Sequence, residues 1–164
     1  MSFDFATVPN RVPWPPIIYL TSGLLAVLLA HISTWSCWLA HRGGHLVSLM
    51  GVAVMLIGVI SDVAAMLAMR RHRANILPHR AATALVTTWP FSWSRNPIYF
   101  GNLLLLIGAG FAFNNIWFFP AALCSYGLVT ILAIKREEAH LAYKFGSLWM
   151  SYAQSTPRWI NLSF

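Results

Sequence analysis

Charged residues are scarce in this sequence, and acidic residues are the scarcest of them. Only 9% of the 164 residues are charged, with 11 Lys and Arg against 4 Asp and Glu. A soluble domain carries about 25% charged residues, so water is not the main solvent of this chain. The 58% hydrophobic content must face lipid as well as other helices. We interpret residues 1–164 as one integral membrane domain.

Cysteine is scarce as well. Cys37 and Cys124 lie in apolar surroundings without paired spacing, which argues against a disulfide framework and a cysteine-based metal site. His41 and His45 are four residues apart, but Gly43 and Gly44 interrupt the helix that would align them, so we expect no metal. In a membrane protein, the net charge of +7 indicates basic loops and contact with lipid headgroups rather than nucleic acid.

Four apolar segments predict membrane helices, at residues 16–35, 45–69, 98–113 and 116–134. A spanning helix needs about 20 residues, and only the third segment is clearly shorter. Its 16 residues rise about 24 Å, less than the hydrocarbon core of about 30 Å. This segment either thins the bilayer or forms a shallow hairpin with the fourth through Asn114 and Asn115. In both cases the outer ends of the pair return to the same side.

The basic residues predict the orientation. The connection 70–95 holds five Arg, and the tail holds Lys135, Arg136, Lys144 and Arg158, whereas the connection 35–44 has only Arg42. Because Lys and Arg concentrate in cytoplasmic loops, we expect both termini in the cytoplasm.

The tail changes its pattern after the fourth segment. Apolar residues recur at helical spacing and form one stripe: Leu141, Phe145, Leu148, Trp149 and Tyr152. We predict a single amphipathic helix over 135–153 that lies at the membrane interface. The expected fold class is therefore all-α and polytopic, with about four transmembrane helices and a C-terminal interfacial helix.

The start of the third segment is the first candidate site. Asn is a preferred N-cap, and proline is favoured at the first helical position, so Asn96 and Pro97 predict a sharp helix start. Free N–H groups and the helix dipole attract anions there, and Arg95 stands beside them. Alternatively, Asn96 only caps the helix and Arg95 only marks the positive boundary.

Glu137 and Glu138 are the second candidate, since they follow the fourth segment and so lie on the side of Arg95. Adjacent helical side chains point about 100° apart, so we expect at most one of the two in a shared pocket. The alternative is a solvated helix start in which Glu137 pairs with Lys135 or Arg136.

Asp62 is the third candidate, because an ionisable residue within a span is a functional hypothesis. A structural ion pair with Arg70, eight residues on, is the alternative. Gly108, Ala109 and Gly110 predict close packing against a neighbouring helix.

Two stretches together resemble a known family. The run LVTTWPFSWSRNPIYFG, residues 85–101, resembles the signature of the isoprenylcysteine carboxyl methyltransferase and phospholipid methyltransferase superfamily. The tail is similar too, with EEAHL at 137–141, Phe145-Gly146, Tyr152 and Pro157-Arg158. The resemblance covers residues 76–160, about half the chain.

The resemblance implies an integral membrane enzyme with an S-adenosylmethionine pocket that faces the cytoplasm, for example at a bacterial inner membrane. The implied cofactor contacts are Thr83, Leu85, Val86, Phe91, Asn96, Pro97, Ile98, Tyr99 and Glu137. Glu137 and Arg95 are the catalytic candidates, and Arg136 and Asp62 the substrate-binding candidates. The implied partners are a lipophilic small-molecule substrate and membrane lipids.

The acceptor group stays open among amine, thiol and carboxylate. Relatives that methylate prenylcysteine carboxylates carry Arg four residues before the first Glu, where this chain has Ala133, which disfavours a carboxylate. Two other functions are compatible with the sequence: a catalytically inactive membrane subunit or assembly factor of the same fold, and a lipid reductase that uses a nicotinamide cofactor.

Overall fold

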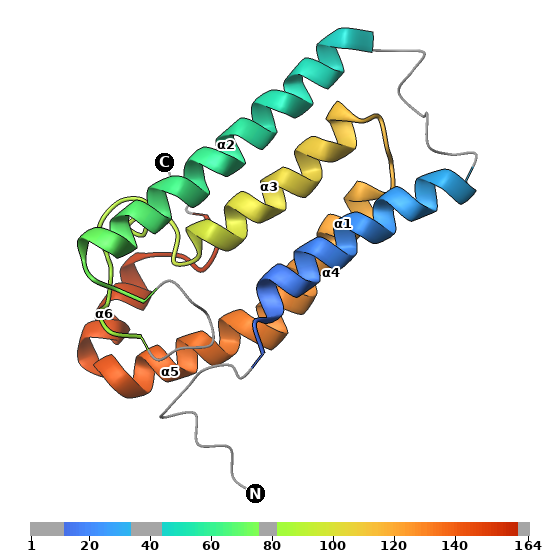
Figure 1. Ribbon diagram of the computed structural model, residues 1–164. Coiled ribbons are helices and arrows are strands. Elements are labelled where there is room, and N and C mark those ends of the chain that lie inside the picture. The colour runs from blue at the N-terminus through green and yellow to red at the C-terminus, as the bar shows by residue number, and fades with distance from the viewer. Residues whose placement is uncertain (1–11, 34–43, 76–81, 161–164) are drawn as a thin grey trace, which may run out of the picture.

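The protein is a bundle of helices, and at one end of the bundle the last helices of the chain pack beside the other elements; we call this the crowded end. The computed structural model describes residues 12–33, 44–75 and 82–160, and every regular element within these ranges is a helix. Figure 1 shows α2 (Gly44–Arg71) beside α3 (Pro97–Ala112), and α1 (Trp14–Ile32) beside α4 (Phe118–Val129). The all-α prediction is confirmed, and the four apolar segments become helices within a few residues of the predicted bounds. Trp35, at the predicted end of the first segment, lies outside the described residues.

Within the described part of the chain, three helices are long and apolar enough to cross a membrane: α1, α2 and the continuous helix Phe118–Phe145. They fit an integral membrane protein, in which helices satisfy every backbone group internally. α3 has only 16 residues, as the sequence predicted. α1 and α3 both carry proline in the first helical positions, where its missing N–H leaves no hydrogen bond unmade.

Small residues bring α2 and α3 together along an antiparallel seam. Gly51 of α2 faces Gly108 of α3, and Gly58 faces Gly101 seven residues further along. A Cβ on Gly51 would come within 2.7 Å of the Gly108 carbonyl oxygen, so only glycine allows this approach. The predicted close packing around Gly108 is therefore confirmed.

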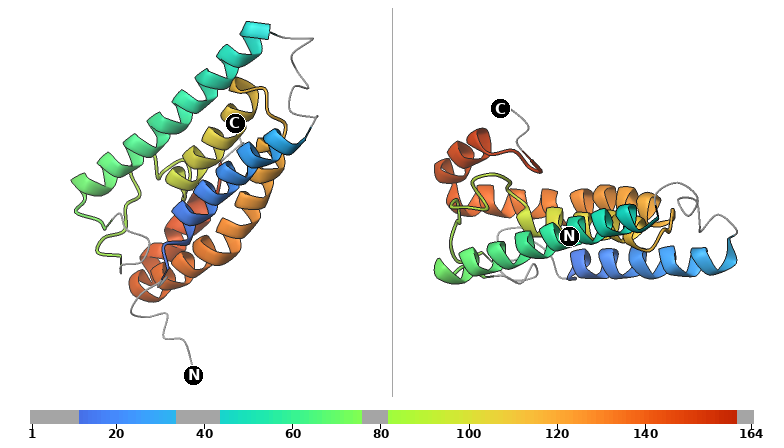
Figure 2. Two further views of the ribbon diagram at one scale, coloured as in Figure 1. Left: turned by 45° about the vertical axis from the view of Figure 1, so that its right-hand side comes forward. Right: turned by 90° about the horizontal axis from the view of Figure 1, so that it is seen from above.

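The turn between α3 and α4 is fixed to α1. Asn115 is buried, its Nδ2 donates to the Ala26 carbonyl at 3.1 Å, and its Oδ1 accepts from the Trp117 N–H at 3.0 Å. These bonds pair both polar atoms of the buried Asn115 side chain with backbone groups. Figure 2 shows the start of α3 and the C-terminal end of the continuous helix Phe118–Phe145 at the same end of the molecule, as predicted.

The tail differs from the single predicted helix 135–153. α4 runs through a π-helical turn, η2 (Thr130–Ile134), into α5 (Lys135–Phe145), and α6 (Ser147–Ser155) follows as a separate helix. Gly146 breaks the helix with φ of 51°, a conformation that glycine adopts without strain. The predicted stripe is split as a result, since Leu148 is 69% exposed whereas Trp149 and Tyr152 are buried.

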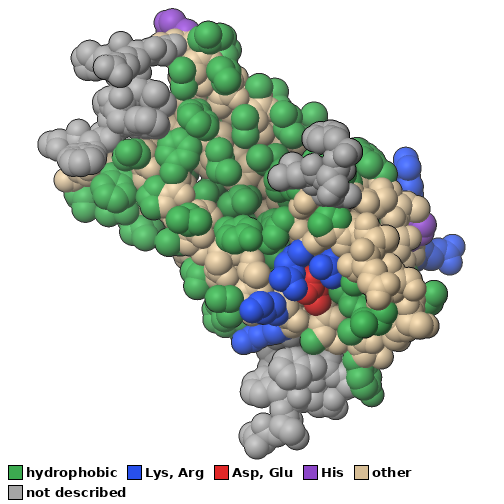
Figure 3. All heavy atoms as spheres, turned by 180° about the vertical axis from the view of Figure 1, so that it is seen from behind, with side chains coloured by type: hydrophobic (Ala, Val, Ile, Leu, Met, Phe, Trp, Pro, Cys, Tyr) green, Lys and Arg blue, Asp and Glu red, His purple; other side chains and the backbone are tan. Residues whose placement is uncertain are grey.

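The outer surface suits a lipid environment. Large apolar side chains of α1 and α2 are exposed along the bundle, among them Leu20, Leu24, Leu46, Leu49 and Ile60. Figure 3 shows hydrophobic side chains over most of one face, while Lys and Arg gather toward one end. That end holds the start of α3 together with α5 and α6 (Figure 1).

Replacement of Gly51 by alanine tests the seam. The Gly51→Ala variant should lower the free energy of unfolding by about 1–3 kcal/mol, because the added methyl group meets backbone atoms of α3. Thermal unfolding of purified protein in detergent measures the change. Gly127→Ala in α4 is the control, since a Cβ there meets nothing within 4 Å. Equal melting temperatures for the two variants would contradict the close approach.

Candidate functional site

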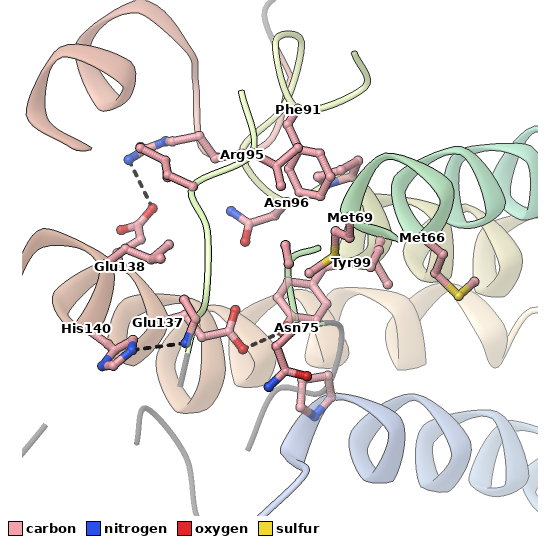
Figure 4. A pocket seen from close by; sticks show the side chains of 18 of the residues that line it. Met66, Met69, Asn75, Phe91, Arg95, Asn96, Tyr99, Glu137, Glu138 and His140 are labelled. Carbon is pink, nitrogen blue, oxygen red and sulfur yellow. Dashed lines mark hydrogen bonds and ion pairs between the residues drawn. The ribbon is translucent and has the colours of Figure 1, made fainter. Parts of the chain in front are cut away.

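A cavity of about 310 Å³ opens at the crowded end of the bundle. Its walls come from the start of α1, the end of α2, the connection before α3, the start of α3, and α5 with α6 (Figure 4). The lining residues are Pro15, Pro16, Tyr19, Met66, Met69, Ala74, Asn75, Ala82, Ala84, Leu85, Val86, Phe91, Arg95, Asn96, Pro97, Ile98, Tyr99, Asn102, Glu137, Glu138, His140, Leu141, Trp149 and Tyr152. Asn96 and Glu137 therefore lie at neighbouring points of one site, as the sequence predicted.

The start of α3 is held by the C-terminal segment. Asn96 occupies the N-cap position, but its side chain makes no capping bond, which corrects the sequence prediction. Its Nδ2 donates instead to the Arg158 carbonyl at 2.9 Å, and its N–H donates to Ser94 Oγ at 3.1 Å. The amide thus ties the first turn of α3, whose residues Pro97, Ile98 and Tyr99 line the cavity, to the tail.

A hydrogen bond joins α3 to α5 across the cavity. The Tyr99 hydroxyl donates to Glu137 Oε1 at 2.6 Å, and Figure 4 shows the two side chains directed at each other. The Tyr19 hydroxyl of α1 donates to the Tyr99 carbonyl at 2.9 Å and so adds a third helix. Glu137 therefore pairs with a phenol, and among the described residues it forms no ion pair with Lys135 or Arg136.

Glu138 also lines the cavity, so the expectation that at most one of the two glutamates does is wrong. It lies between two guanidinium groups. Arg158 donates to both carboxylate oxygens, from Nε at 2.9 Å and from a terminal nitrogen at 2.6 Å, and Arg95 lies 3.3 Å from Oε1. Two cations around one carboxylate leave this cluster with a net charge of +1.

Arg95 keeps unused donor capacity in this cluster. Its guanidinium lies over the Trp149 ring, 5.5 Å from the centroid, which favours a cation. Its Nε is buried and has no hydrogen-bond partner within the described part of the chain. A buried donor without a partner costs free energy, so the position is suited to a ligand that accepts a hydrogen bond.

The connection that precedes α3 is fastened to α5 and α6. His140 Nε2 accepts from the Ala82 N–H at 3.3 Å, and the Tyr152 hydroxyl donates to the Phe91 carbonyl at 2.6 Å. Burial raises the pKa of the Tyr152 phenol, although Arg95 opposes the shift, so Tyr152 remains a donor. These bonds hold Phe91 and its neighbours as one wall of the cavity.

Nine of the twelve residues to which the resemblance assigns a role lie at this cavity: Leu85, Val86, Phe91, Arg95, Asn96, Pro97, Ile98, Tyr99 and Glu137. Three do not line it. Thr83 is exposed and donates to the Arg73 carbonyl at 2.8 Å, Arg136 is partly buried on α5, and Asp62 lies deeper in α2. Asp62 contacts Asn102 rather than Arg70, so the alternative ion pair is wrong.

Sequence reasoning missed residues that come from distant segments. Tyr19, Met66 and Met69 reach the cavity only because α1 begins and α2 ends beside it. Asn102 had a usable signal, since it is the only amide within the predicted apolar segment 98–113. No group of three His, Cys, Asp or Glu residues gathers within the described ranges, and His41 lies outside them.

Comparison with known proteins gave one match. A family profile described as phospholipid methyltransferase matches residues 46–147, which is more than half of the chain. The match begins one helix earlier than the resemblance seen in the sequence, so it includes α2. Searches of curated proteins and of solved structures gave no match.

The Glu138 cluster makes a prediction about stability. Glu138→Ala leaves two partly buried guanidinium groups without their shared carboxylate, so it should lower the free energy of unfolding by about 3 kcal/mol. Thermal unfolding of the purified variant in detergent measures this loss of stability. Lys144→Ala, which removes an exposed charge from the same helix, is the control. A melting temperature equal to that of the control would show that the cluster does not hold the tail in place.

Proposed function

Because the chain belongs to the phospholipid methyltransferase family, we propose that it transfers the methyl group of S-adenosylmethionine to a lipophilic acceptor in the membrane. Membership of this family implies that the chain is a methyltransferase. The observation that carries the proposal is the single cavity that joins the start of α3 and Glu137 to the apolar ends of α1 and α2. A water-soluble donor and a lipid both have access to such a site.

The polar side of the cavity fits the cofactor. The Glu138 cluster has a net charge of +1, and Arg95 Nε is a buried donor without a partner among the described residues. Together with the first turn of α3, they suit the carboxylate of the methionyl group. Glu137 has a second carboxylate oxygen for an ammonium or hydroxyl group, and Phe91, Trp149 and Tyr152 offer aromatic walls for an adenine ring.

The volume is also compatible with this role. About 310 Å³ lies at the lower end of the range of about 300–1,000 Å³ for small-molecule sites. When bound, S-adenosylmethionine supplies a methyl group on a sulfonium, which the acceptor's lone pair takes while the electron pair of the broken C–S bond stays on sulfur.

The residues of the chain contribute alignment and exclusion of water. Correct orientation of reacting groups contributes about 7–11 kcal/mol to such a reaction. The hydrogen bonds of Tyr99 and Tyr19 fix Glu137 and α1 relative to α3, so the walls are rigid before a ligand binds. An amine acceptor must first release a proton to solvent, whereas a thiolate or carboxylate needs no base.

The acceptor reaches the cavity from the bilayer in this proposal. α1 contributes Pro16 and Tyr19, and α2 contributes Met66 and Met69, yet α1 and α2 do not pack against each other. An acyl chain can therefore lie between them with its headgroup in the cavity. The exposed apolar surface of both helices places lipid on either side of this route.

The cavity faces the cytoplasm in this proposal. The end of the bundle that contains it also carries most of the basic residues of the described chain, because the end of α2 and α5 hold Arg70, Arg71, Lys135, Arg136 and Lys144 and Arg73 follows α2. The turn at Asn114 and Asn115, at the opposite end, carries none. Such a charge bias marks the cytoplasmic side.

Isothermal titration with S-adenosylhomocysteine tests the proposal. The wild-type protein in detergent should bind it, and Glu137→Gln should weaken binding by about tenfold or more, because a charged acceptor is lost. Lys135→Gln, on the same helix but exposed, is the control and should bind like the wild type. Absence of binding to the wild type, or equal affinity of Glu137→Gln, would contradict the proposed cofactor site and favour an inactive subunit.

A further inference from the structure

α2 has a helical neighbour on only one side. Within the described part of the chain it packs against α3 and against no other helix, and Figure 1 shows it at one edge of the bundle. Gly51 and Gly58 belong to the side that faces α3. The opposite side carries exposed apolar residues at helical spacing, which are Leu49, Leu56, Ile60, Val63 and Leu67. We call these five residues the outer stripe of α2.

The outer stripe ends in two arginines. Arg70 and Arg71 follow Leu67 by three and four residues, so both continue the same face of the helix. Both are exposed, and neither lines the cavity. This face of α2 is therefore apolar along most of its length and basic at its C-terminal end.

The length of the outer stripe matches the thickness of a bilayer. Leu49 and Leu67 lie about 27 Å apart along the helix axis, close to the thickness of about 30 Å of a hydrocarbon core. Arg70 and Arg71 lie about 5–6 Å beyond Leu67. When hydrocarbon surrounds the stripe, the two guanidinium groups reach the level of the lipid headgroups, where the phosphates lie.

The two arginines have no anionic partner within the described ranges. The ion pairs found there belong to Glu138, which is held by two other arginines, and Asp62 contacts Asn102 on the α3 side of the helix. The end of α2 does not need the guanidinium groups as caps either. Its last carbonyls accept from backbone N–H groups of the residues that follow. Both cations are thus available to an anion from outside the chain.

A second copy of the chain fits this face less well than a lipid does. Helices that associate in a membrane approach through small residues, as α2 and α3 do, whereas the outer stripe consists of Leu, Ile and Val. Two copies in the same orientation would also bring their Arg70 and Arg71 side chains together, and like charges repel. An anionic phospholipid satisfies both halves of the face, since acyl chains cover the stripe and a phosphate neutralises the arginines.

We propose that the outer face of α2 binds an anionic phospholipid, with its acyl chains along the outer stripe and its phosphate at Arg70 and Arg71. An anionic headgroup is preferred over a zwitterionic one, because no cation of the lipid offsets the phosphate. The site is separate from the cavity and goes beyond the proposed function. It stabilises the end of α2, whose Met66 and Met69 form part of the cavity wall.

Two phospholipids that differ only in the headgroup test this site. Phosphatidylglycerol and phosphatidylcholine with the same acyl chains are titrated into the detergent-solubilised full chain, and native mass spectrometry reports the affinity of the first bound lipid. The wild type should bind phosphatidylglycerol at least about tenfold more tightly, since each arginine near an anionic headgroup contributes about fivefold. Arg70→Gln/Arg71→Gln should reduce this preference to about threefold or less.

A matched variant separates a defined site from general attraction. Lys135→Gln/Lys144→Gln removes the same number of exposed charges from α5 and should keep the wild-type preference. Inorganic phosphate should not displace the lipid, because it lacks acyl chains. A wild-type preference near one, an equal loss in both double variants, or displacement by inorganic phosphate overturns the inference.

Two further measurements distinguish the remaining outcomes. A lipid-free dimer that Ile60→Asn dissociates would assign the outer stripe to a second copy and overturn the lipid site. Affinity for S-adenosylhomocysteine should be the same in the wild type and in both double variants, because neither pair of residues lines the cavity. Failure of the wild type to bind S-adenosylhomocysteine would contradict the proposed function and leave the lipid preference as a separate result.

Discussion

The hydrogen bond between the Tyr99 hydroxyl and the Glu137 carboxylate is the contact on which the site depends. It forms only if the first turn of α3 and the α5 extension of α4 lie at the same end of the bundle. The turn at Asn115 makes this possible, since its bonds to Ala26 fix the α3–α4 hairpin to α1. The hydrogen bond between Tyr99 and Glu137 therefore depends on the arrangement of α1, α3 and the continuous α4–α5 helix.

Another wall of the cavity depends on the ion pairs of Glu138. Glu138 gathers Arg95 and Arg158 around itself, and Arg158 in turn accepts from Asn96 through its carbonyl oxygen. The tail is thereby folded back over the start of α3. In a chain with four acidic residues, the pairing of one carboxylate with two guanidinium groups keeps a positive charge at the cavity.

Much of the fold could be predicted from the sequence, because apolar segments of helical length leave few alternatives in a membrane. The helix start at Pro97 was predicted correctly. So was the hairpin of the third and fourth segments, whose outer ends lie at the same end of the bundle. The predicted cap bond of Asn96 does not form, and its bond to the tail could not be predicted, since the partner Arg158 lies 62 residues away. The helix break at Gly146 and the π-helical turn before Glu137 depend on tertiary packing that local patterns do not report.

Transfer of a labelled methyl group tests the central claim most directly. Purified protein is incubated with S-adenosylmethionine labelled in its methyl group and a membrane lipid extract, and the lipid fraction is then separated and counted. The account predicts labelled lipid with the wild type and little or none with Glu137→Ala. Label absent from the lipid fraction of the wild type, or equal in both proteins, would contradict the claim that this cavity holds the donor and a lipid acceptor together.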